Sequence, residues 1–219
     1  MRALMHDRTN ENKTMRTEEI AIFKYDELSN EAKAKAREWW RQSSSGETYW
    51  SECVIDEVKE QGDLMGLEIS NVYFSGFWSQ GDGACFEGNW NAANVKADQV
   101  ADGWGDCRET QQIKGIASRF AEIAKAWPNA YFGVKHQGRY SHEHSTSFDI
   151  VLDENSDGES GYEGDIDEAE ASIIETARDY MRWIYRQLEK AYEDYNSDEQ
   201  IAGNIEANSY EFTEDGKIY

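Results

Sequence analysis

The sequence predicts an α+β protein in which an antiparallel sheet, made of two hairpins plus the terminal strands, is packed by several helices. Two observations support this class. Pairs of segments rich in aromatic and β-branched residues are joined by short glycine-containing stretches, as in β-hairpins. Other segments repeat apolar residues every three or four positions, as in amphipathic helices. The 219 residues are enough for one hydrophobic core, so we expect a single α+β domain over residues 17–219 and a flexible leader over residues 1–16.

The expected helices follow from apolar spacing and from helix-start signals. Ser29 is the expected N-cap of the first helix, because its hydroxyl can accept a hydrogen bond from a backbone N–H of the first turn. The longest helix, over residues 167–195, would pack one continuous apolar stripe on the sheet. The expected helical ranges are 29–42, 49–61, 95–101, 109–126, 167–195 and 197–208.

The expected strands centre on a hairpin that is rich in glycine. Its strands, residues 69–78 and 84–90, flank the polar turn Ser79–Gly83. Glycine weakens a strand and fills no core, so its repeated use here indicates a β-bulge or a close approach of another backbone or a ligand. The other expected strands are 19–25, 131–140, 145–152 and 210–219.

The net charge limits the choice of partners. With 22 Lys and Arg against 44 Asp and Glu, the formal charge is −22 at pH 7. Such a chain is repelled by phosphate backbones and by anionic membranes, so we expect no direct nucleic-acid binding and no membrane association. Three options stay open: a solvated surface, a basic protein partner, or imitation of a nucleic acid.

The cysteines and the hydropathy pattern place the chain in a reducing cytosol. Cys53, Cys85 and Cys107 are odd in number and widely spaced, so they indicate neither a disulfide framework nor a dedicated metal motif. We expect neither a signal peptide nor a membrane span, because the sequence shows no apolar run of the required length. No cofactor is expected.

The glycine-rich hairpin and a basic segment downstream are candidates for a ligand site. The turn could cradle an anion or a base edge with its backbone N–H groups, between aromatic walls. The basic segment around Lys135 is one of few in this acidic chain and could contact a phosphate. A tight turn over an apolar core is the alternative. The predicted ligand-binding residues are Trp78, Ser79, Gln80, Asp82, Lys135, His136 and Arg139.

Two segments offer weak metal-binding candidates. On a strand, His142 and His144 would point to the same side and could hold a divalent ion with Asp82 or Glu143. The loop Asp153–Gly158 has the first half of a calcium-loop pattern, but it lacks the acidic residue expected at its twelfth position. Dedicated metal spacings are absent, so no metal is expected. The weak candidates are His142, His144, Asp153, Asn155 and Asp157.

No catalytic residue stands out. Cys85 and His136 could form a nucleophile and base, but Cys85 lies among apolar strand residues and is expected in the core. A metal-dependent hydrolase using His136, His142 and His144 is the weakest alternative.

The carboxylates form the most prominent surface candidate. Between Asp153 and Glu170 there are nine acidic residues and no Lys or Arg. A charge run of this kind is usually a solvated face, but carboxylates spaced along helices can imitate the phosphates of a duplex. The predicted partner-binding acidic face consists of Asp153, Glu154, Asp157, Glu159, Glu163, Asp165, Asp167 and Glu168.

One string, Ser75–Gly88 (SGFWSQGDGACFEG), resembles the signature of a family of uncharacterised proteins from tailed phages and prophages. Segments Tyr25–Arg37, Met181–Lys190 and Tyr210–Lys217 are similar to the same family, so the resemblance covers most of the chain from about Thr17 onward. It implies a phage source and the cytoplasm of the infected bacterium, and it carries over no catalytic residues.

Resemblance and charge together predict a non-enzymatic phage accessory protein. We expect it to bind and inhibit a basic host or defence protein that handles nucleic acid, as a counter-defence factor and nucleic-acid mimic. The alternative from a different class is a small-ligand binder that sequesters a nucleotide-like signal through the glycine-rich hairpin.

Overall fold

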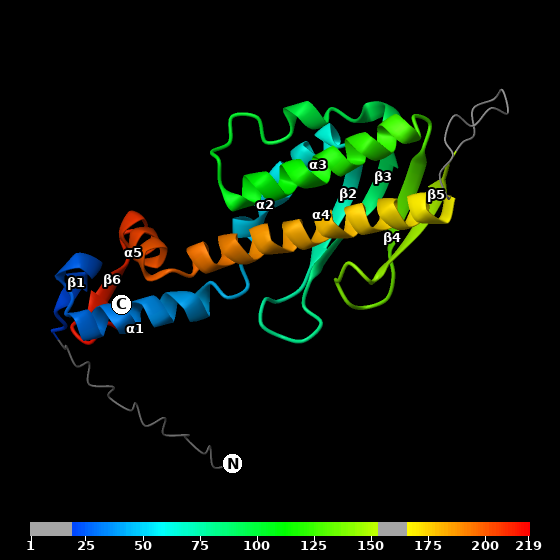
Figure 1. The fold of residues 1–219 in the computed structure, drawn as a ribbon. Coiled ribbons are helices and arrows are strands. Elements are labelled where there is room, and N and C mark those ends of the chain that lie inside the picture. The colour runs from blue at the N-terminus through cyan, green and yellow to red at the C-terminus, as the bar shows by residue number, and fades with distance from the viewer. Residues whose placement is uncertain (1–18, 153–165) are drawn as a thin grey trace, which may run out of the picture. The chain divides into compact units, whose positions relative to one another are not determined.

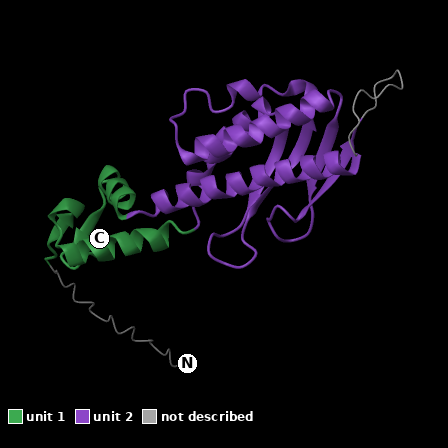
Figure 2. Ribbon diagram, in the orientation of Figure 1, with its two compact units in different colours: residues 1–45, 198–219 green, residues 46–197 purple. Residues whose placement is uncertain are grey.

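The computed structural model describes residues 19–152 and 166–219, and these residues confirm the α+β class (Figure 1). The described residues contain five α-helices and two antiparallel sheets, of four and two strands. The chain divides into two compact units, residues 46–197 and residues 1–45 with 198–219 (Figure 2). The predicted leader, residues 1–16, lies outside the described residues.

The larger unit, residues 46–197, is a four-stranded antiparallel sheet with helices on one face (Figure 1). The strand order is β2-β3-β4-β5, so each strand pairs with its neighbours in the sequence, and both predicted hairpins are present. The strands are β2 (Leu67–Phe74), β3 (Ala84–Asn91), β4 (Tyr131–His136) and β5 (Thr146–Val151). The helices are α2 (Tyr49–Leu64), α3 (Arg108–Ala126) and α4 (Ile166–Tyr195).

Trp90 on β3 lies at the centre of the core of this unit. Its ring stacks on Phe132 of β4, with centroids 5.4 Å apart, and packs against Phe120 of α3 at 5.6 Å. Its indole N–H donates to the carbonyl of Met65 at 2.8 Å, so the one polar atom of the side chain is satisfied where water is excluded. Burying a ring of this size stabilises the fold by about 3 kcal/mol.

A β-bulge interrupts the pairing of β2 with β3, as the glycine pattern predicted. The register shifts between Ile69 and Asn71, and Gly88 lies opposite the shift. A Cβ at Gly88 would lie 2.1 Å from the carbonyl oxygen of Glu68, so no other residue fits without moving the neighbouring strand. The bulge is therefore a place where two backbones approach closely.

The structure corrects the ends of two predicted strands and the type of one predicted element. Strand β2 ends at Phe74 rather than at residue 78, because the Asp82 carboxylate accepts hydrogen bonds from the backbone N–H groups of Trp78 (3.1 Å) and Ser79 (2.7 Å) and closes a wider loop. Strand β4 ends at His136 rather than at residue 140. The helix expected near residues 95–101 is instead a pair of short 3₁₀ turns, η2 (Ala92–Asn94) and η3 (Ala97–Gln99).

The smaller unit contains both terminal strands. The prediction that these strands join the sheet of the two hairpins is wrong, because they pair with each other in a separate two-stranded sheet. Their own small core explains this pairing, because Phe212 of β6 is fully buried and packs against Tyr25 and Trp39. Ser29 is the N-cap of α1, as predicted, and its hydroxyl accepts from the Ala32 N–H at 3.2 Å. The elements are β1 (Ile22–Lys24), η1 (Tyr25–Glu27), α1 (Asn30–Ser43), α5 (Asp198–Ala207) and β6 (Glu211–Thr213).

Two glycines with positive φ provide a matched test of crowding. Gly66, which follows α2, has φ +83°, and a Cβ there would lie 2.7 Å from the Asn91 carbonyl oxygen. Gly103 has φ +76°, and a Cβ there would meet nothing within 4 Å. We expect Gly103→Ala to cost about 1–2 kcal/mol for the left-handed backbone alone. Gly66→Ala should cost about 1–3 kcal/mol more, because a neighbouring backbone must move.

The measurement is urea unfolding of both variants and of the wild type, with the free energies compared. Equal losses of stability in the two variants would contradict the crowding at Gly66.

Candidate functional site

Two loops meet at one end of the four-stranded sheet. The β2–β3 loop spans residues 75–83 and the β4–β5 loop spans residues 137–145. They are in contact, since a Cβ at Gly83 would lie 3.0 Å from the carbonyl oxygen of Ser141 and 3.0 Å from the ring of His142. The structure therefore places side by side the two segments from which the predicted ligand-binding residues come.

The β2–β3 loop presents one large aromatic side chain to solvent. Trp78 is 74% exposed, and its ring lies 5.4 Å from that of Tyr192 on α4. The preceding Phe77 is buried and packs against Tyr192 and Trp50. The carboxylate of Asp82, a predicted ligand contact, accepts hydrogen bonds from the loop backbone. The loop thus combines a fixed backbone with an accessible ring. Ser79 and Gln80, which were also predicted to bind the ligand, are exposed in the same loop.

The three predicted basic residues differ in their surroundings. The His136 ring stacks on Tyr73 with centroids 4.7 Å apart, and its Nε2 lies 3.0 Å from the carbonyl oxygen of Tyr140. The Arg139 guanidinium lies over the Tyr140 ring at 5.2 Å and is exposed. Lys135 is exposed on β4. Arg139 is therefore in the loop and accessible, whereas His136 supports the loop from the strand end.

Glu87 is a structural centre of this region that the sequence did not reveal. Its carboxylate accepts from the Tyr73 hydroxyl at 2.8 Å, from Asn71 at 3.4 Å and from the His136 backbone N–H at 3.2 Å. The Tyr73 hydrogen bond above all holds the pKa of Glu87 below its ordinary value, and the opposing effect of burial is smaller. Glu87 thus ties β2 and β3 to the end of β4.

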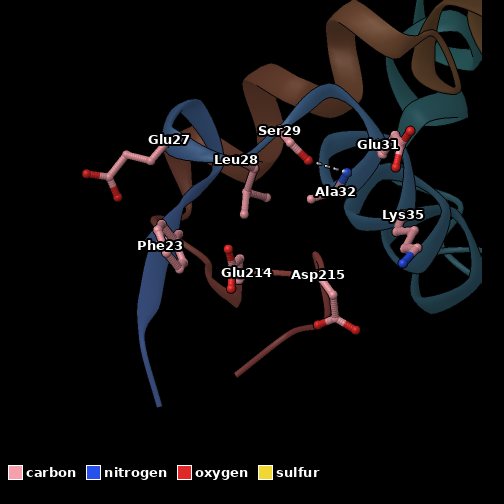
Figure 3. A pocket seen from close by; sticks show the side chains of 9 residues that line it. All are labelled: Phe23, Glu27, Leu28, Ser29, Glu31, Ala32, Lys35, Glu214 and Asp215. Carbon is pink, nitrogen blue, oxygen red and sulfur yellow. Dashed lines mark hydrogen bonds between the residues drawn. The ribbon is translucent and has the colours of Figure 1, made fainter. Parts of the chain in front are cut away.

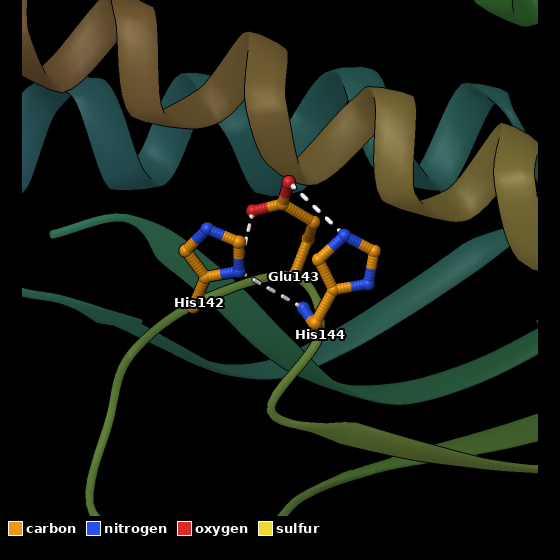
Figure 4. Close-up of side chains that lie close together, drawn as sticks. All are labelled: His142, Glu143 and His144. Carbon is orange, nitrogen blue, oxygen red and sulfur yellow. Dashed lines mark hydrogen bonds and ion pairs between the residues drawn. The ribbon is translucent and has the colours of Figure 1, made fainter. Parts of the chain in front are cut away.

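His142, Glu143 and His144 converge in the β4–β5 loop (Figure 4). Glu143 Oε2 lies 3.0 Å from Nδ1 of His142, and Glu143 Oε1 lies 3.9 Å from Nε2 of His144. In the part of the chain that the structure describes, no other group of three or more His, Cys, Asp or Glu side chains meets so closely. His136, the third histidine of the hydrolase alternative, is not part of the group.

An arginine on α4 anchors this cluster. The Arg182 Nε donates to Glu143 Oε1 at 3.0 Å, and its Nη1 contacts Glu175 at 2.7 Å and Asp179 at 2.6 Å. These hydrogen bonds, led by that of Glu175, raise the pKa of Arg182. Burial acts to raise the pKa of Asp179, but hydrogen bonds from Arg119 and Arg182 outweigh it, and the net shift is downward. The Glu143 side chain is only 13% exposed and is fixed by this network.

Cys85 is not a nucleophile in this fold. Its side chain is fully buried, as predicted, and burial raises the pKa of its thiol to about 11. The thiolate, which is the reactive form, is therefore scarce at neutral pH.

The smaller unit contains an acidic hollow of about 420 Å³ (Figure 3). Its lining comes from two segments that are distant in the sequence, so no local pattern predicted it. Four acidic residues and one lysine are among the residues that line it: Glu27, Glu31, Glu214, Asp215 and Lys35. Lys217 and Thr213 bond to the Asp215 carboxylate and lower its pKa to about 2, so part of this charge is already neutralised.

A row of exposed acidic residues lies along α2. Glu52, Asp56, Glu60 and Asp63 are all exposed and follow one another at intervals of four, four and three residues. We call these four residues the α2 acidic stripe. None of them forms an ion pair with another residue in the described ranges.

The acidic face that the sequence predicted falls mostly outside the described residues. Asp167 and Glu168 lie in the first turn of α4, and they are exposed. The other six members, and the metal candidates Asp153, Asn155 and Asp157, are within residues 153–165, which the structure does not describe.

Comparison with known families identifies the larger unit. Residues 50–198 match the family described as a domain of unknown function (DUF8835), and the chain belongs to this family. The match includes the sheet, its three helices and both loops. No curated protein and no solved structure matches the chain. Within the described ranges, the helices are too short or too polar to cross a membrane.

The hydrogen bond between Tyr73 and Glu87 gives a pH-dependent prediction. Because the folded-state pKa of Glu87 is lowered, its ionised form stabilises the fold above its unfolded pKa, and this contribution is lost as the pH falls through the folded pKa. Tyr73→Phe removes the strongest donor, so we expect the pKa of Glu87 to rise toward its ordinary value. The stability difference between wild type and Tyr73→Phe should then shrink in acid.

NMR titration of the Glu87 carboxyl and urea unfolding at several pH values provide the measurements. Tyr131→Phe is the control, because it removes a hydroxyl that bonds to Asn89 and leaves Glu87 untouched. An unchanged pKa of Glu87 in Tyr73→Phe would contradict the assignment of the Tyr73 hydrogen bond as the main cause of the lowered pKa.

Proposed function

We propose that this chain is an acidic, non-enzymatic accessory protein that binds a basic, nucleic-acid-handling protein and inhibits it by occupying its nucleic-acid surface. The α2 acidic stripe is the observation that carries the proposal. The stripe belongs to a helix that the structure describes in full, and its members form no ion pairs with described residues.

The spacing of the stripe suits a phosphate-binding surface. Four residues of α-helix rise about 6 Å and three rise about 4.5 Å, so successive carboxylates of the stripe are about 4.5–6 Å apart along the helix axis. Phosphates of one DNA strand follow every 3.4 Å or so along the duplex axis, and each carboxylate would stand for about every second phosphate. Only one basic residue, Lys59, lies on this helix, and its Nζ contacts the Ser70 carbonyl oxygen at 3.3 Å.

The excess charge supports a use in binding. A formal charge of −22 destabilises the compact state through self-repulsion. A basic partner would relieve this repulsion, and complementary fields would accelerate the encounter. The interaction should weaken steeply with salt, because exposed charges are screened over about 10 Å at 0.1 M ionic strength.

The phage resemblance supplies the biological setting of the proposal. A protein made by a tailed phage in the cytoplasm of its bacterial host meets host and defence enzymes whose nucleic-acid surfaces are basic. Blocking such a surface would protect the phage genome or redirect a host process, which is counter-defence or host takeover.

Neutralising the stripe should weaken binding. We expect a quadruple variant, Glu52→Gln, Asp56→Asn, Glu60→Gln and Asp63→Asn, to bind its partner about thirtyfold more weakly, at roughly 0.5 kcal/mol for each exposed charge pair. The partner is captured with the tagged wild type from a phage-susceptible bacterium, then purified and titrated. Added duplex DNA and added salt should each release the bound partner.

The control neutralises four exposed carboxylates of the smaller unit, at Glu199, Glu206, Glu211 and Glu214, and changes the net charge equally. Its affinity should stay close to that of the wild type. Equal affinities of the stripe variant and the wild type would refute the proposal.

A second candidate function is supported by the contact between the two loops. Gly83 meets His142, so exposed Trp78 and Arg139 belong to loops that lie against each other. An aromatic ring and a guanidinium group are the elements that hold a nucleotide-like molecule by stacking and charge. In this alternative the protein sequesters a nucleotide signal.

Trp78→Ala combined with Arg139→Ala tests the second candidate. Stacking on one ring contributes about 1–3 kcal/mol, so the pair should weaken binding of a cyclic nucleotide at least about tenfold. Thermal shift with cyclic nucleotides is the measurement, and Tyr219→Ala, which removes another exposed ring, is the control. Tight nucleotide binding by the double variant would refute the assignment of Trp78 and Arg139 as ligand contacts.

A further inference from the structure

We infer that His142, Glu143 and His144 form a binding site for one divalent transition-metal ion, with Zn²⁺ as the best match. The inference does not depend on either proposed function. It rests on the positions of three ligand groups, on the hydrogen bonds around them and on the arginine that orients the carboxylate.

The three ligand atoms face a common space. Figure 4 shows the Glu143 carboxylate between the two imidazole rings. One ligand atom from each residue lies within 4.8 Å of the others, and the rings of His142 and His144 are nearly parallel, with centroids 5.3 Å apart. A tetrahedral Zn²⁺ with ligands at 2.0–2.1 Å places those ligands about 3.4 Å apart. Glu143 Oε2 lies 3.0 Å from Nδ1 of His142, and Glu143 Oε1 lies 3.9 Å from Nε2 of His144, so the two separations fall on either side of this value. Rotation of the carboxylate and of the His144 ring would bring one oxygen and both imidazoles to a common ion.

The convergence comes from a turn and not from a strand. On a strand, alternation would place Glu143 on the face opposite the two histidines. Here the three residues lie in a turn that the Ser145 N–H closes on the His142 carbonyl oxygen at 2.8 Å. The turn allows the intervening carboxylate to join the two imidazoles.

The hydrogen bonds leave a place for positive charge. The backbone N–H of His144 donates to Nδ1 of His142 at 3.2 Å, so this nitrogen is an acceptor and its one lone pair points to that N–H. A metal ion at Nδ1 would replace this hydrogen bond. Glu143 Oε2, also an acceptor, lies 3.0 Å from the same nitrogen. A cation bound between this nitrogen and Glu143 Oε2 would attract both groups.

Arg182 prepares the carboxylate for this role. It holds Oε1 of Glu143 at 3.0 Å and thereby turns Oε2 toward His142. An outer hydrogen bond of this kind fixes the orientation of a metal ligand and is a general feature of protein metal sites. Asp179 and Glu175 also bind Arg182, so three carboxylates share the one positive charge of the guanidinium.

The ligand set selects the class of metal. Imidazole nitrogens favour Zn²⁺, Cu²⁺ and Ni²⁺ over Mg²⁺ and Ca²⁺, which prefer oxygen ligands. Two imidazoles with one carboxylate leave a fourth tetrahedral position for water. A bound ion would also clamp the β4–β5 loop where it meets Gly83 of the β2–β3 loop.

Isothermal titration of the full-length, chelator-treated protein with ZnCl₂ tests the site. We expect one ion per chain, and a visible absorption spectrum of tetrahedral Co²⁺ when CoCl₂ replaces it. His144→Gln should weaken Zn²⁺ binding at least about tenfold, since even the loss of an outer-shell partner has effects of that size. The His144 side chain is 59% exposed, so this variant should fold.

His6→Gln is the matched control, because it removes a histidine that lies outside the cluster in the sequence, and it should bind Zn²⁺ like the wild type. His142→Gln should repeat the loss seen in His144→Gln. Absence of stoichiometric Zn²⁺ binding by the wild type would overturn the inference. Binding of one ion with equal affinity by the wild type and by both cluster variants would overturn it as well.

Discussion

The buried indole of Trp90 is the contact on which the larger unit depends. One side chain reaches Phe132 on the next strand and Phe120 on α3, and its N–H bonds to the carbonyl of Met65 at the end of α2. It therefore fixes the sheet, one helix and the end of another at a single point. The β2–β3 register that contains Trp90 also places Gly88 opposite the bulge. Together with the β3–β4 register, it positions the strand ends at which the β2–β3 and β4–β5 loops begin.

The helices could be predicted from the sequence because their signals are local. Apolar spacing of three and four located α4 almost to the residue, and a single hydroxyl at Ser29 marked the start of α1. The strand ends could not be predicted in the same way. Strand β2 stops where the Asp82 carboxylate bonds to backbone N–H groups, and the pairing of β1 with β6 joins segments nearly two hundred residues apart. Interactions between distant residues leave no periodic pattern in the sequence.

In the candidate site, too, the sequence predicted what depends on residue type and missed what depends on contacts between residues. Residue type alone nominated Trp78, Arg139 and the two histidines of the turn, and the structure places their loops in contact. The sequence could not show that Asp82 is used by its own loop, or that Glu143 is anchored by Arg182, which lies 39 residues further along. Glu87 was missed because a single acid within an apolar strand resembles an ordinary solvent-facing position until its three donors are known.

The contrast among the three cysteines has a practical consequence. Cys85 is buried with a pKa of about 11, whereas Cys53 and Cys107 are exposed. Maleimide reagents react with the thiolate of an accessible cysteine, so the folded chain should take label at only these two positions. Cys53 directly follows Glu52 on α2. A fluorophore placed there, with Cys107 replaced by serine, would sit beside the carboxylates of that helix and report on their surroundings without any engineered attachment point.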